Sequence, residues 1–151
     1  MRQGETTDTS ERASVPQTLG RITLGAFLLL AGVSHLTWSR EDFLAQVPPW
    51  LPLDGDFVVI ASGVVEILLA VALLVLPRLR IQVGWVVAAF FVAVFPGNIS
   101  QFVTRTDAFG LDSDLARGIR LAFQPLLILW ALWCTGECRT WRAGRRATTS
   151  G

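Results

Sequence analysis

The sequence predicts an all-α protein: a bundle of four transmembrane helices with a short amphipathic interfacial segment in the first outer loop. Of the 151 residues 52% are hydrophobic, and the mean hydropathy of +0.49 is too high for an ordinary soluble domain with one core. Four apolar stretches are each long enough, at about 1.5 Å per residue, to cross a hydrocarbon core of about 30 Å. The predicted spans are residues 19–38, 57–76, 81–103 and 115–137.

The two ends of the chain are polar. The segment MRQGETTDTSERASVP has mixed charge, which predicts a disordered cytoplasmic N-terminus over residues 1–17. The membrane domain is then residues 18–137, followed by a basic cytoplasmic tail at 138–151. No A-x-A-like cleavage site follows the first span and three further spans do, so this span is interpreted as uncleaved.

The distribution of arginine predicts the topology. All 13 basic residues are arginine; nine fall at the chain ends and in the turn between the second and third spans, and four fall on the other side. Because the positively charged side of a membrane protein faces the cytoplasm, both termini are expected to be cytoplasmic. The net charge of +1 does not suggest nucleic acid as a partner.

The first outer loop, residues 39–56, has the features of a short helix. Ser39 and Asp42 fit a capping box, and prolines end the segment. Apolar residues form one side of it: Phe43, Leu44, Val47, Trp50 and Leu51. The segment is expected to lie in the membrane interface, either as a lid or as an anchor with no further role.

The second span contains one charge, Glu66, near its middle. Inserting an acid at that depth of the membrane costs at least about 2.5 kcal/mol of free energy, so Glu66 is expected to face a partner or a cavity. Arg120 is long enough to reach it from the fourth span. Two interpretations stay open: a structural Glu66–Arg120 ion pair, or an anionic or proton-exchanging site. His35 suits proton transfer, or is a satisfied core histidine.

Other polar residues are predicted at the same outer level of the membrane. The candidate ligand-binding residues are His35, Glu66, Asn98, Gln101, Arg120 and Gln124. The amides are alternatively interhelical contacts that stabilise the bundle. Pro96 with Gly97, and Pro125, are predicted to kink the third and fourth helices, and two interruptions at this level are predicted to mark a pocket.

The remaining motifs indicate structure rather than chemistry. Asp112 or Asp114 is expected to cap the fourth span, since EF-hand spacing is absent. No metal site is predicted, because His35 and Glu66 lack a third ligand. Cys134 and Cys138 are expected to be reduced bystanders. Two small residues of the first span, Gly25 and Gly32, are predicted to allow close helix packing.

Five motifs in series then resemble the DoxX-like family of small bacterial integral membrane proteins. They are AGVSHL, VPPWLP, SGVVEILLA, VFPGNI, and Arg120 with Gln124 before the LW-rich end of the fourth span. This chain departs from the family pattern at two places. Family members often have Ala where this chain has Gly97, and they usually have Pro-Leu-Gln where this chain has Ala122-Phe123-Gln124 followed by Pro125. The resemblance implies a four-helix bundle in the bacterial cytoplasmic (inner) membrane. Its relatives include a subunit of a thiosulfate:quinone oxidoreductase and a methylamine dehydrogenase maturation protein.

The leading hypothesis is an accessory protein of membrane redox, quinone or oxidative-stress metabolism that binds a quinone-like or lipid-like molecule in the outer-half pocket. The expected partners are membrane lipids and either a redox enzyme subunit or a second copy of the chain. The alternative is a non-catalytic scaffold or partner-binding subunit whose buried polar cluster is structural. A small-solute transporter is the third hypothesis. A stand-alone enzyme is disfavoured, because no nucleophile–base pair, phosphate loop or metal-ligand set is present in the sequence.

Overall fold

The computed structural model describes residues 13–107, 110 and 113–136, and every regular element in this part of the chain is a helix. The elements in order are α1 (Val15–Leu36), α2 (Arg40–Leu44), α3 (Gly55–Val75), the 3-10 turn η1 (Pro77–Leu79), α4 (Arg80–Thr104) and α5 (Asp114–Thr135). The four long helices are long and apolar enough to cross a membrane. The prediction of an all-α four-helix membrane bundle is confirmed, and the chain is a multi-pass membrane protein.

The first helix begins earlier than predicted. Residues 15–17, assigned above to a disordered segment, form the first turn of α1. Ser14 donates to the Gln17 side chain from both its backbone nitrogen (3.2 Å) and its hydroxyl (3.1 Å). Pro16 fits here because the first turn has no use for its missing N–H. The basic tail at 138–151, with Cys138, lies outside the described residues, as do residues 1–12.

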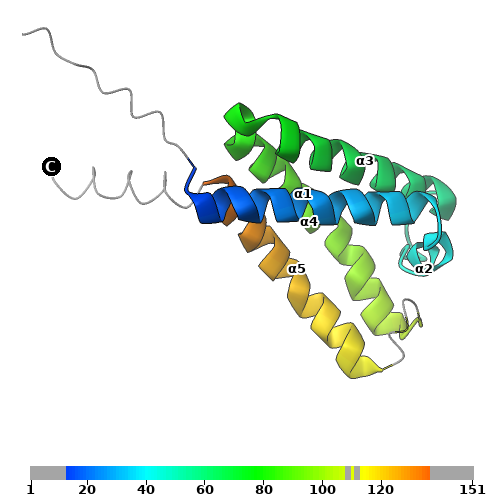
Figure 1. Ribbon diagram of the computed structural model, residues 1–151. Coiled ribbons are helices and arrows are strands. Elements are labelled where there is room, and N and C mark those ends of the chain that lie inside the picture. Colours follow the sequence, from blue (N-terminus) through cyan, green and yellow to red (C-terminus); the bar gives the residue numbers. More distant parts are fainter. Residues whose placement is uncertain (1–12, 108–109, 111–112, 137–151) are drawn as a thin grey trace, which may run out of the picture.

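The bundle consists of two antiparallel pairs, α1 with α3 and α4 with α5, which make the most extensive contacts. In Figure 1 the α4–α5 pair leaves the α1–α3 pair obliquely, so that the pairs are close at the end where α1 begins and diverge toward α2. The hydrophobic core lies in the close half, with members on all four long helices: Leu24, Leu28, Leu69, Ala70, Leu73, Val83, Val87, Phe91, Ala131 and Cys134. The other half is therefore less tightly filled.

Two buried polar side chains join the helices at the close end. Arg21 donates from Nη1 to the carbonyl of Leu73, one of the last α3 carbonyls, which lack a helical donor. Gln17 donates to the carbonyl of Trp133, near the end of α5, at 3.1 Å. Neither contact was predicted from the sequence.

Arg21→Met is expected to lower the free energy of unfolding by about 1–3 kcal/mol, because it removes a charged donor and leaves the Leu73 carbonyl unpaired. Thermal unfolding in mild detergent, followed by circular dichroism, measures the change. The exposed Arg78 supplies the matched control, Arg78→Met. Equal melting temperatures for the two variants would show that the Arg21 contact does not stabilise the bundle.

Close packing at Gly25 and Gly32 is confirmed. A Cβ atom at Gly32 would lie 2.7 Å from the carbonyl oxygen of Gly63, and one at Gly25 would lie 2.9 Å from Leu74 Cδ2. The contact at Gly32 is with backbone, so α1 and α3 can pack at this distance only because that position lacks a Cβ, whereas a Cβ at Gly25 would require the Leu74 side chain to shift.

Three local predictions were wrong. Ser39 precedes α2 but makes no capping hydrogen bond, because its φ of −107° and ψ of 15° differ from the extended conformation of a capping residue. Ser113, rather than Asp112 or Asp114, caps α5 by accepting from Ala116 N at 3.2 Å; Asp112 itself lies outside the described residues. Pro96 and Pro125 do not interrupt their helices, which continue through both prolines.

Candidate functional site

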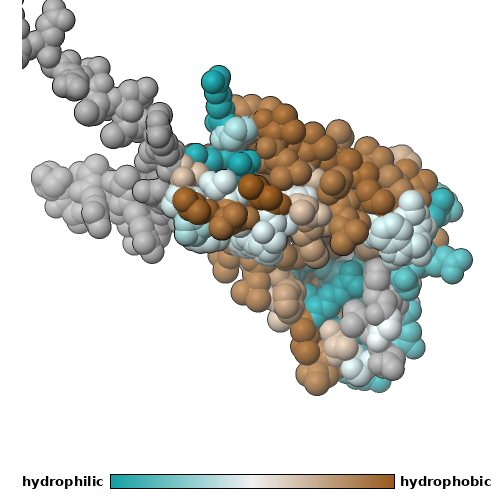
Figure 2. All heavy atoms as spheres, in the orientation of Figure 1, coloured by the Kyte–Doolittle hydropathy of each residue, from teal (hydrophilic) through white to brown (hydrophobic). Residues whose placement is uncertain are grey.

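A cavity of about 670 Å³ lies between the two helix pairs. Its lining comes from all four long helices and from the α2 region. This volume falls within the range of about 300–1,000 Å³ that is usual for ligand pockets. In Figure 2 hydrophilic side chains lie in the recess between the α1–α3 pair and the α4–α5 pair, with hydrophobic surface on both sides.

Aromatic rings account for much of the apolar lining. They are Phe27, Phe43, Trp50, Phe90, Phe91, Phe123 and Trp130. Phe27 and Phe123 are also about half exposed on the helix surface, at 49% and 55%. The cavity therefore reaches the apolar surface that faces lipid, and an apolar molecule can contact rings on several sides.

The α1–α3 side of the cavity carries a buried acid and a buried histidine. Nδ1 of His35 lies 3.0 Å from Oε2 of Glu66, and each residue is 8% exposed. The predicted Glu66–Arg120 ion pair is thus wrong: the partner of Glu66 is His35. The reason is the close approach of α1 to α3 at Gly32 and Gly63, which places these side chains in contact.

The α2 segment covers His35. The Phe43 ring stacks on the imidazole, with centroids 3.3 Å apart and planes 16° from parallel. Nδ1 of His35 also lies 2.9 Å from the carbonyl oxygen of Ala31, one turn earlier in α1. The imidazole is therefore fixed between its own helix, α2 and α3.

The α4–α5 side carries amides and an arginine. Asn98 donates to Gln124 Oε1 at 2.9 Å, and Gln124 Nε2 donates to the carbonyl of Phe91 at 2.7 Å. This carbonyl is next to that of Val92, whose usual donor is lost at Pro96. Arg120 also lines the cavity, and Asp42 of α2 interacts with its charge.

Two predicted residues are not part of the cavity lining: Gln101 and Pro125. Gln101 is 2% exposed; it accepts from Gln46 Nε2 and donates to the Thr106 carbonyl, each at 3.3 Å. It fixes the segment after α2 to the end of α4. Pro96 and Gly97 do line the cavity, and a Cβ at Gly97 would lie 3.1 Å from the carbonyl oxygen of Gln46.

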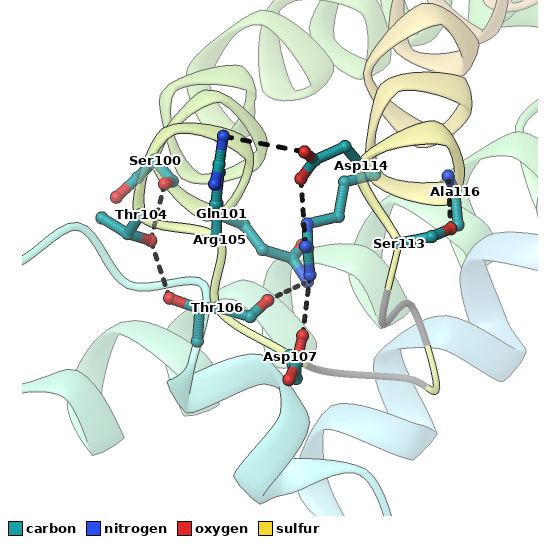
Figure 3. Close-up of polar contacts among 10 residues, drawn as sticks. Ser100, Gln101, Thr104, Arg105, Thr106, Asp107, Ser113, Asp114 and Ala116 are labelled. Carbon is teal, nitrogen blue, oxygen red and sulfur yellow. Dashed lines mark hydrogen bonds and ion pairs between the residues drawn. The ribbon is translucent and has the colours of Figure 1, made fainter.

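A polar cluster connects the end of α4 to the start of α5 (Figure 3). Arg117, buried, binds Asp107 at 2.7 Å and Asp114 at 3.1 Å, while Arg105 lies 3.8 Å from Asp114. Because the acids are exposed, each ion pair alone contributes little to stability. Together the ion pairs join the two helix ends. Among the described residues, no group of three or more His, Cys, Asp or Glu side chains is placed to hold a metal ion.

Gln124→Leu is expected to lower the free energy of unfolding by about 1 kcal/mol, because each interhelical hydrogen bond in a membrane contributes roughly 0.6 kcal/mol and this change removes two. The melting temperature in detergent measures it. Gln82→Leu, at an exposed position of α4, is the control. A melting temperature unchanged from wild type would contradict a stabilising role for the Asn98–Gln124–Phe91 contacts.

Comparison with known proteins does not assign an activity to this chain. A family model described as "Domain of unknown function (DUF8561)" matches residues 24–135, which include most of α1 and all of the other helices. No curated protein matches the chain. No solved structure matches it either.

Proposed function

Because the chain belongs to this family of unknown function, we propose its function from the cavity: it binds an apolar, quinone-like or lipid-like molecule inside the membrane. In this proposal the protein is a non-catalytic accessory of redox or oxidative-stress metabolism in the bacterial inner membrane, with both termini in the cytoplasm. The resemblance to the DoxX-like family supports the placement in the bacterial inner membrane. The arginine distribution supports the cytoplasmic position of both termini.

The observation that carries the proposal is a cavity with aromatic walls and polar groups on two opposite sides. Ligand pockets typically combine an apolar lining with a few placed polar groups. Here His35 and Glu66 come from one helix pair, and Asn98, Arg120 and Gln124 come from the other. In this proposal a flat ring lies between them, and its polar substituents contact both sides.

The two sides differ in hydrogen-bonding capacity. Arg120 can only donate, and an asparagine amide has two N–H groups, of which Asn98 uses one on Gln124. These groups suit a ligand carbonyl. The exposed rings of Phe27 and Phe123 offer an apolar tail a route to the surrounding lipid.

Binding of ubiquinone-1 to the purified protein tests the proposal. Ser62 lines the cavity one turn from Glu66, so Ser62→Phe fills part of the volume without removing a charge. We expect this variant to bind at least about tenfold more weakly, and Arg120→Gln to bind about tenfold more weakly through loss of a charged donor. Isothermal titration calorimetry in mild detergent measures both.

Ala89→Phe is the matched control, since Ala89 is an exposed position of α4 outside the cavity lining. It adds the same ring without entering the site and should leave binding unchanged. Absence of binding of both ubiquinone-1 and its reduced form to wild-type protein, or equal binding of ubiquinone-1 by wild type, Ser62→Phe and Arg120→Gln, would refute the proposal.

The alternative is a scaffold whose buried polar groups only fix packing. It is favoured by one observation: Gln124 is bonded on both sides, to Asn98 and to Phe91. A scaffold predicts that mass spectrometry of the protein in mild detergent finds a stoichiometric partner protein and no small molecule. The ligand-binding proposal predicts the reverse.

A further inference from the structure

Glu66 has an unfilled hydrogen-bonding position. Its Oε2 is buried and no described residue donates a hydrogen bond to it. His35 approaches to 3.0 Å, but its Nδ1 also lies 2.9 Å from the Ala31 carbonyl oxygen. A neutral imidazole has one N–H, and the hydrogen bond to Ala31 is the aligned one. The Glu66 contact is therefore close but not a hydrogen bond.

A buried acceptor without a donor is costly, about 1–3 kcal/mol and more for a charged group. Buried polar groups in native proteins are nearly always bonded, so each exception needs an explanation. Both Glu66 and His35 line the cavity. A molecule in the cavity can therefore supply the missing donor to Glu66.

The charges around the cavity restrict what kind of donor this is. Arg120 lines the same cavity and interacts with Asp42, and a charged amine that enters from the lipid side would lose its hydration at a cost of at least about 2.5 kcal/mol. An anion at Arg120 would in turn be repelled by Glu66. A neutral molecule avoids both penalties, and an O–H group is the neutral donor that suits a carboxylate and a flat ring.

We infer that the cavity selects a hydroxylated aromatic ring, the reduced quinol class, over the corresponding quinone, with the ring hydroxyl donating to Glu66. This rests on the proposed function and specifies its ligand. Glu66 accepts from one ring substituent, while Arg120 or Asn98 donates to an oxygen on the opposite side. A quinone offers acceptors only, so it leaves Glu66 Oε2 unpaired.

The test compares three probes that share one ring skeleton and tail: ubiquinol-1, ubiquinone-1 and the bis-O-methyl ether of ubiquinol-1, which keeps the reduced ring but cannot donate. Calorimetry is done under argon, so that the quinol stays reduced. A hydrogen bond to a charged acceptor corresponds to roughly a 10- to 100-fold difference in affinity. We expect ubiquinol-1 to bind at least about tenfold more tightly than either the quinone or the ether.

Glu66→Gln keeps the size of the side chain but can donate as well as accept. The preference for the quinol should fall below about threefold in this variant, largely because the quinone gains a donor. Asp56→Asn makes the same chemical change at an exposed residue paired with Arg40 outside the cavity lining and should keep the full preference. The wild-type comparison of the three probes stands even if Glu66→Gln does not fold.

The possible outcomes separate this inference from the proposed function. Equal affinities for all three probes, or tighter binding of the quinone, would overturn the selection of a hydroxyl donor and leave the ligand pocket standing. Loss of the preference in Asp56→Asn as well as in Glu66→Gln would also overturn the role of Glu66. Binding of none of the probes would overturn both.

Discussion

Gly63→Ala is expected to lower the free energy of unfolding by about 1–3 kcal/mol, the usual cost of overpacking. A Cβ at Gly63 would lie 2.8 Å from His35 Cβ and 3.0 Å from the carbonyl oxygen of Gly32. Neither is the mobile end of a long side chain, so α1 must move away from α3. That movement separates His35 from Glu66, and ligand affinity should fall with stability.

Thermal unfolding and ubiquinol-1 titration, both in the same detergent, measure the two effects. Gly118→Ala is the control, because a Cβ there would meet only Phe102 at 3.7 Å, an ordinary contact. It should keep or raise stability, since alanine favours a helix by about 1 kcal/mol over glycine. Stability of Gly63→Ala equal to that of Gly118→Ala would show that the α1–α3 contact is not as tight as described.

The positions of the four long helices could be predicted from the sequence because the bilayer imposes a length. An apolar stretch near twenty residues is a strong signal, and the predicted spans differ from the helices by a few residues at their ends. Those differences come from local chemistry. Ser14 and Gln17 extend α1, and Ser113 caps α5 in place of its acidic neighbours. Ser and Asp are equally good caps, so only the backbone conformation decides between them.

The level of the polar residues was also predictable, but not their partners. Counting along each helix gives a depth, and it predicts that Glu66, His35 and Arg120 share one level of the membrane. The choice depends on which helices pack closest. Gly32 was recognised as a packing position, but its opposite residue, Gly63, was not. Without that contact, the His35–Glu66 pair could not be chosen over an ion pair with Arg120.

The same limitation explains Gln101 and Arg21. Gln101 is three residues after Asn98, so the two side chains differ by about 60° around the helix. That rotation is enough to direct Gln101 to Gln46 and Thr106 instead of to the cavity. Arg21, at the end of its span, has the position of an arginine that extends to the interface, but it donates to Leu73 of α3. Depth alone does not reveal which neighbouring carbonyl lacks a donor.

Gly84→Ala is expected to destabilise the protein by about 3 kcal/mol, toward the upper end of overpacking costs. A Cβ at Gly84 would overlap Thr135 Oγ1 and would lie 2.7 Å from its Cβ and 2.9 Å from its Cγ2. Thr135 is fully buried, and its hydroxyl donates to the Ala131 carbonyl at 2.7 Å. It cannot rotate away without losing that bond, so α4 and α5 must separate.

The double variant Gly84→Ala with Thr135→Gly removes the side chain that the added methyl group would meet and should recover at least half of the loss in unfolding free energy. Thr135 is the last residue of α5, where glycine costs less than the roughly 1 kcal/mol of a helix interior. Gly118→Ala with Thr135→Gly is the control pair, whose effects should add because the sites do not touch. Additive losses for Gly84 and Thr135 would contradict the contact. The contact between Gly84 and Thr135 lies at the close end of the bundle. Folded Gly84→Ala should therefore still bind ubiquinol-1 with wild-type affinity, whereas Gly63→Ala should not.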